Sequence, residues 1–192
     1  MIGSFWFNSF SAGGGGAAAD YELISTTVLG SSAASVTFSG LGTSAAAYKH
    51  LQIRAAIRTD YTSPFNDCYL QFNGVTSSSY SWHQLYGYNG SVGSSAGSST
   101  VSIDLGSAVG ASNAASAFSA MVVDIADFQS TSKNKTLKSL SGGAGSTGGT
   151  NSILNLYSGA WYSTSAVTSF LIYPSSGNFV TGSRFSLYGL KA

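Results

Sequence analysis

Apolar and polar residues alternate along much of the chain after residue 20. Leu51, Ile53 and Ile57 are apolar, whereas the positions between them carry polar residues such as Gln52 and Arg54. An alternation with period two predicts a strand that has one buried and one solvated face. The same alternation recurs in four other stretches: Val36–Phe38, Leu70–Phe72, Val101–Leu105 and Met121–Ile125.

Three later segments are apolar at nearly every position, which predicts central strands or strands whose outer face is covered by a partner. These segments are Ile153–Tyr157, Phe170–Tyr173 and Phe185–Leu190. Such double-sided apolar strands would be an aggregation hazard in an isolated monomer, so we expect a homodimer or homotrimer.

Short turn-forming stretches separate these segments. Asn73-Gly74 and Asn89-Gly90 are the strongest turn signals, because this dipeptide favours the positive φ angles of a tight turn. We count about ten strands, and only Ala108–Ala117 has the composition of a helical turn. The prediction is therefore an all-β fold, an antiparallel two-sheet sandwich of jelly-roll type, over residues 20–192.

Composition narrows the function classes. Only 8% of the 192 residues are charged, and the net charge is +1, with no basic stripe that would bind nucleic acid. The single cysteine, Cys68, excludes an intrachain disulfide and a Cys/His zinc site, and we expect it to be a small buried apolar residue. We expect no metal and no cofactor.

The first nineteen residues are predicted to form an aromatic arm ahead of the domain. Phe5, Trp6, Phe7 and Phe10 precede a Gly/Ala-rich linker at residues 11–19. No Lys or Arg precedes them, and the apolar run is too short for a membrane span, so we expect neither a signal peptide nor a membrane segment. Large aromatic side chains gain free energy on burial, so this arm is expected to anchor the chain to a partner.

Catalytic signatures are weak. The stretch 143–148 matches a GxGxxG pattern, but it leads into a strand rather than a helix. His50 is expected at a strand entrance making a hydrogen bond, and His83 is expected on the strand face opposite Trp82. Asp104 and Asp124 fit outward positions on strands. We therefore expect no enzyme and no catalytic residues.

One aromatic segment is a candidate binding surface. Tyr80, Trp82, Tyr86 and Tyr88 share one face of the predicted strand 80–88, together with Gln84. Aromatic rings beside amide and hydroxyl groups are typical of protein interfaces and also stack on sugar rings. Burial of the same face as ordinary core is the third alternative.

The order of several short stretches resembles a family of virion proteins of tailed bacteriophages that infect aquatic bacteria. The resemblance covers about residues 20–191 and rests on the stretches 21–26, 36–41, 48–54, 70–74, 85–87, 158–161 and 183–190. The most distinctive of these are the strand sequence YKHLQIR and the closing FSLYGL.

The resemblance implies a non-enzymatic component of the virion, assembled in the host cytoplasm. We favour a capsid cement or decoration protein, because no repetitive shaft or heptad of a fibre is present. Its expected partners are further copies of itself and other virion proteins such as the major capsid protein. The alternative is a tail fibre or appendage module that binds host-surface carbohydrate through the aromatic face.

Overall fold

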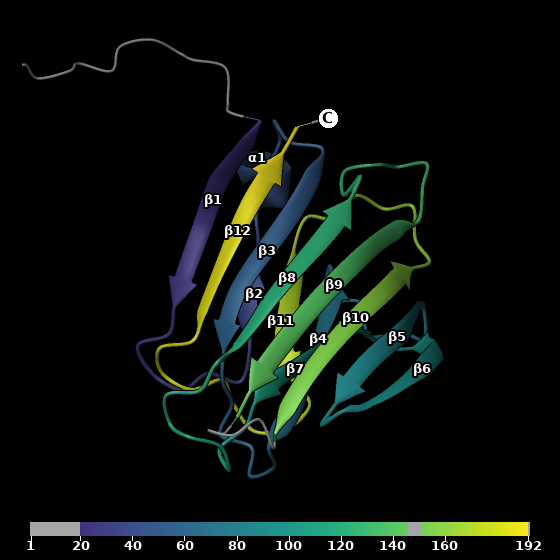
Figure 1. Ribbon diagram of the computed structural model, residues 1–192. Coiled ribbons are helices and arrows are strands. Elements are labelled where there is room, and N and C mark those ends of the chain that lie inside the picture. Colours follow the sequence, from purple (N-terminus) through teal and green to yellow (C-terminus); the bar gives the residue numbers. More distant parts are fainter. Residues whose placement is uncertain (1–19, 146–150, 192) are drawn as a thin grey trace, which may run out of the picture.

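Two antiparallel β-sheets make up almost all of the regular secondary structure in the described residues. A computed structural model describes residues 20–145 and 151–191. The larger sheet has the strand order β1 (Tyr21–Val28), β12 (Arg184–Leu190), β3 (His50–Ile57), β8 (Ser119–Ala126), β9 (Lys135–Ala144), β10 (Ser152–Trp161), β5 (Tyr80–Tyr88) and β6 (Ser91–Thr100). The smaller sheet has the order β2 (Val36–Phe38), β11 (Phe170–Pro174), β4 (Phe65–Phe72) and β7 (Ile103–Val109). Figure 1 shows the smaller sheet behind the larger one. The predicted antiparallel two-sheet sandwich is confirmed.

The strand order is that of a jelly roll with two added hairpins. Without β5–β6 and β9–β10, the sheets are β1-β12-β3-β8 and β2-β11-β4-β7. The chain then changes sheet at every step except from β4 to β7, which pair with each other in the smaller sheet, as in the two Greek keys of a jelly roll. Both hairpins extend the larger sheet beyond β8, so that β5 and β6 lie at the edge furthest from β1 (Figure 1).

The core lies between the sheets and is built from the predicted alternating faces. In β3, Leu51, Ile53 and Ile57 are buried, whereas Arg54 on the other face is exposed. Side chains from β8 and the smaller sheet complete the same hydrophobic cluster. Cys68 is fully buried in it, as expected, and burial raises the pKa of its thiol.

Both predicted Asn-Gly turns adopt the left-handed conformation that this dipeptide favours. Asn89 and Gly90 have φ angles of 48° and 85° and join β5 to β6 in a two-residue hairpin. Asn73 and Gly74, with φ angles of 51° and 69°, instead turn the chain from β4 in the smaller sheet toward β5 in the larger one.

The helical prediction is wrong. The described residues contain one short helix, α1 (Leu41–Ser44), which begins after Gly40. The predicted helical turn covers Ala108–Ala117. Ala108 and Val109 belong to β7 instead, and the chain after Val109 forms a loop. The guanidinium of Arg58 holds this loop by donating hydrogen bonds to four backbone carbonyl oxygens, those of Ala111, Asn113, Ala114 and Ala117. In the described part of the chain no helix is long and apolar enough to cross a bilayer.

Candidate functional site

Five exposed apolar side chains gather on the outer face of the two added hairpins. Leu140, Leu156 and Leu85 are direct cross-strand neighbours on β9, β10 and β5. Leu154 lies two residues further along β10, and Val92 lies on β6. Their exposed fractions run from 42% for Leu156 to 90% for Val92. We call these five residues the leucine face.

The rest of the outer face carries mostly polar and aromatic side chains, with single apolar residues such as Val122 beside Leu140 and Leu23 on β1. On β3 the guanidinium of Arg54 lies 5.5 Å from the ring centroid of Tyr21, which stacks on Tyr188 at 4.8 Å. Between the two halves, the ammonium of Lys138 pairs with the Asp124 carboxylate at 3.3 Å. The leucine face is therefore a bounded patch on the sheet. It contains a shallow hollow of about 630 Å³, lined mainly by its own leucines.

A second candidate site lies on the inner side of the same hairpins. The larger sheet extends past β7, the edge of the smaller sheet, and β7 packs against β9 and β10. The inner face of β5 then lies beside the outward residues of β4 and β7. The hollow between them has a volume of about 450 Å³. We call it the corner groove; its lining includes Asp67, Tyr69, Trp82, Gln84, Tyr86, Tyr88, Ser95, Asp104, Ser107 and Tyr157.

Two of the groove's aromatic rings lie over glycines of the neighbouring strand. A Cβ atom placed on Gly93 would come within 2.5 Å of the Tyr86 hydroxyl, and one on Gly97 within 2.6 Å of the Trp82 ring. These are the cross-strand partners of the same two aromatic residues. The absence of a side chain at Gly93 and Gly97 lets the two rings pack against the sheet, which is the way aromatic residues cover strand glycines.

The groove also contains two carboxyl groups. Asp104 is almost fully buried, and this burial together with the charge of Asp67 raises its pKa to about 7. It accepts hydrogen bonds from the Gly106 backbone N–H at 2.9 Å and from the Tyr157 hydroxyl. Asp67 is exposed and accepts a hydrogen bond from the Ser107 hydroxyl at 2.9 Å. Within the described residues neither carboxyl forms an ion pair.

Asp104 occupies the predicted outward position on its strand but is not exposed to solvent. Its side chain does point away from the core, as expected, but the overhanging β10 and β5 cover it, so it is buried. Asp124 is an outward residue as predicted.

The predicted aromatic face is divided by the structure. Trp82, Tyr86 and Tyr88 line the corner groove with Gln84. Tyr80 is fully buried in the core, and its hydroxyl donates to the carbonyl oxygen of Val75 at 3.0 Å. Tyr80 therefore cannot contact a ligand or partner. The arm residues Phe5, Trp6, Phe7 and Phe10 lie outside the described residues.

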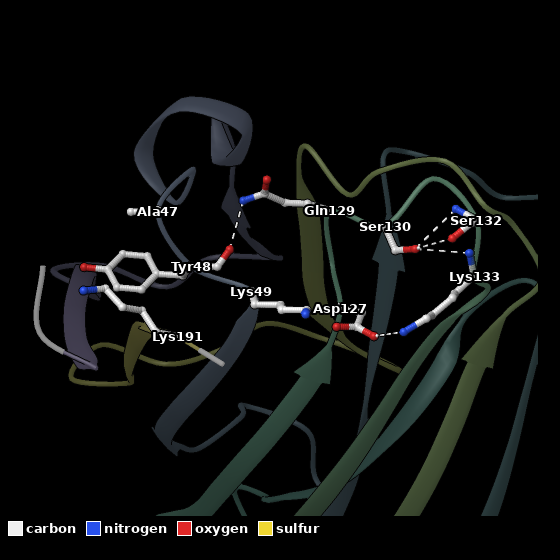
Figure 2. A pocket seen from close by; sticks show the side chains of 9 residues that line it. All are labelled: Ala47, Tyr48, Lys49, Asp127, Gln129, Ser130, Ser132, Lys133 and Lys191. Atoms are coloured by element: carbon white, nitrogen blue, oxygen red, sulfur yellow. Dashed lines mark hydrogen bonds and ion pairs between the residues drawn. The ribbon is translucent and has the colours of Figure 1, made fainter.

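A polar hollow of about 660 Å³ lies at the end of β3 and β8 (Figure 2). The Asp127 carboxylate binds the Lys133 ammonium at 2.6 Å, and this contact lowers the pKa of Asp127. The Gln129 amide donates to the carbonyl oxygens of Ala45, Ala46 and Tyr48. These side chains bind one another and the backbone, so their role is to fix the loop that follows β8.

The histidines lie where the alternation places them. The Nδ1 atom of His50, at the start of β3, accepts a hydrogen bond from the Asp127 backbone N–H at 3.0 Å. His83 is exposed on the outer face of β5, opposite Trp82. No group of three or more His, Cys, Asp or Glu side chains within residues 20–145 and 151–191 has the arrangement of a metal site.

Comparison with known proteins gives no match: no protein-family model, no curated protein and no solved structure is significantly similar to this chain.

Proposed function

We propose that this protein is a non-enzymatic structural component of a phage particle, a cement or decoration protein that stabilises the head through contacts between subunits. The observation that carries the proposal is the leucine face. A monomeric protein rarely leaves a contiguous patch of large aliphatic side chains in water, and such patches mark sites of protein association. The low charge of the chain fits the same role, because interface cores are depleted in charged residues.

The apolar area of the leucine face limits the free energy that its burial between subunits can contribute. Its five side chains expose the equivalent of about three whole side chains, and burying those contributes about 5–9 kcal/mol. Association of two proteins costs about 4–15 kcal/mol in lost translational and rotational freedom. The leucine face alone therefore supports weak association, and a stable assembly needs a second contact.

The aromatic arm of a neighbouring copy is the occupant that we assign to the leucine face. The arm contains no charged residue, and burial of its four aromatic side chains contributes about 6–12 kcal/mol before the tether is ordered. The arm precedes β1, which is five strand spacings, or about 24 Å, from β10. The nine-residue linker typically reaches about 15–18 Å and about 30 Å only when fully extended, so binding to the face of its own subunit needs a nearly stretched tether, and we assign the arm to the face of an adjacent subunit.

The proposal is tested by replacing Leu140, Leu154 and Leu156 with Thr, which keeps the strand propensity but removes apolar surface. The control is Leu23→Thr on β1, because Leu23 is 52% exposed and lies at the opposite edge of the sheet. Sedimentation equilibrium measures self-association, and cosedimentation with phage heads that lack the protein measures attachment.

We expect the triple variant to remain folded but to lose self-association and attachment to heads, while Leu23→Thr behaves as the unaltered protein. Full association and attachment of the folded triple variant would contradict the assignment of the leucine face.

A further inference from the structure

We propose that the corner groove is a saccharide-binding site that takes an oligosaccharide of neutral sugars. This inference goes beyond the assembly role and uses side chains on the opposite face of β5. Successive side chains of a strand point to opposite faces, so Trp82 and Tyr86 lie on the inner side of β5, whereas Leu85 lies on the outer side. Burial of the leucine face in an assembly therefore leaves the groove open.

The aromatic rings provide stacking platforms. Trp82 and Tyr86 are four residues apart on one strand face, which separates them by about 13 Å. Each ring lies over its cross-strand glycine of β6, and the Thr100 methyl group lies beside the Trp82 ring at Gly97. Trp82 is further fixed by edge contact with the Tyr157 ring at 5.8 Å. The apolar face of a sugar ring stacks on an aromatic ring. Because the two rings are about 13 Å apart, one sugar cannot contact both, and a chain of sugars can.

Hydrogen-bond acceptors lie between and beside these rings. The Gln84 side-chain nitrogen donates to Asn155 Oδ1 at 2.9 Å, which orients the amide and leaves its oxygen without a partner in the described residues. Asp67 uses Oδ1 for the Ser107 hydroxyl, and its Oδ2 likewise has no partner in that part of the chain. Sugar hydroxyl groups are donors that match such acceptors, and hydrogen bonds to a carboxylate are among the stronger ones.

The charge of the groove selects among sugars. Asp67 and Asp104 both line it, and no lysine or arginine is among its lining residues. An anionic sugar would bring a further negative charge beside the exposed Asp67 carboxylate and would be repelled. A protein partner that buried the groove would have to supply a hydrogen-bond donor to Asp67 Oδ2, because burying this oxygen without a partner costs free energy. A neutral saccharide satisfies the acceptors without adding charge.

The test uses the full chain and a panel of cellotetraose, maltotetraose, mannotetraose and chitotetraose, with tetragalacturonate as the anionic comparison. Binding is followed by isothermal titration calorimetry and by tryptophan fluorescence, since Trp82 lines the groove. The variants are Tyr86→Ala, which removes a stacking ring, and Asp67→Asn, which is conservative and exposed. Tyr162→Ala is the control, because Tyr162 is 58% exposed and is not among the groove's lining residues.

We expect at least one neutral tetrasaccharide to bind and tetragalacturonate to bind at least tenfold more weakly. Tyr86→Ala should weaken binding about tenfold or more, Asp67→Asn should weaken it several-fold, and Tyr162→Ala should leave it unchanged. Absence of binding to all four neutral probes, equal binding of tetragalacturonate, or unchanged affinity of both groove variants would each overturn the proposal. The leucine-face variants should bind as the unaltered chain does, so failure of the assembly role is measured separately.

Discussion

Asp104→Asn should change how the stability of the fold depends on pH. In the native state, burial and the charge of Asp67 raise the pKa of Asp104 from 3.8 to about 7. Between these two values the folded protein holds a proton that the unfolded chain has released. The free energy of unfolding therefore falls as the pH rises from about 4 to about 7, and the loss is complete above that window.

The magnitude follows from the shift. A difference of about three pKa units corresponds to about 4 kcal/mol, since one unit is about 1.4 kcal/mol. Asparagine carries no charge and still accepts the hydrogen bond from the Gly106 backbone N–H. Asp104→Asn should thus exceed the stability of the unaltered protein by only about 1 kcal/mol near pH 4.5 and by up to about 4 kcal/mol at pH 8.

Urea unfolding at pH 4.5, 6 and 8 measures this difference. Asp67→Asn should lower the native pKa of Asp104 and reduce the pH dependence, because it removes the neighbouring charge. Asp124→Asn is the control, since that carboxylate lies on the outer face and pairs with Lys138. A pH profile of Asp104→Asn parallel to that of the unaltered protein would refute the reasoning.

Three further predictions concern other parts of the chain. Deletion of residues 1–19 should leave the melting temperature nearly unchanged and weaken self-association in sedimentation equilibrium; a large loss of stability would place the arm in the core instead. Arg58→Met should lower the free energy of unfolding by about 3–5 kcal/mol in urea titrations, because four carbonyl oxygens lose their charged donor; a loss below about 1 kcal/mol would show that water replaces the guanidinium at little cost. The Cys68 thiol should react with Ellman's reagent only as the protein unfolds, because it is buried and its pKa is raised; rapid reaction of the native protein would contradict its burial.

The sequence pattern predicts the strands of the jelly-roll core and also β5 and most of β10, but it does not predict β6 and β9. β3 and β8 carry large apolar residues at every second position, so their buried faces are evident from the sequence. β6 consists almost entirely of Gly, Ser and Ala and has no apolar alternation. Its strand conformation comes from pairing with β5 and from the rings that cover its glycines. Most of β9 escapes prediction as well, because its inward face is largely polar where it meets β7, as in the Ser139 hydroxyl bonded to the Leu105 carbonyl oxygen.

The candidate sites are predictable in part. The aromatic face of β5 follows from the spacing of Trp82 and Tyr86, and the structure separates Tyr80 from it. The carboxyl groups of the corner groove do not follow from the sequence, because Asp67 and Asp104 meet β5 only through the overhang of the larger sheet. The leucine face has a local signal in the doubly apolar segment Ile153–Tyr157, but Leu85 and Leu140 join it only through the strand register.

An electron-microscopy map of the intact virion tests the central claim most directly. Our account predicts density for the jelly-roll domain on the outer surface of the head. In that density Leu140, Leu154 and Leu156 should be buried against a neighbouring subunit, with Trp82 and Tyr86 open to solvent. A map that places the domain at the tail with the leucine face exposed, or purified virions that lack the protein, would contradict the account.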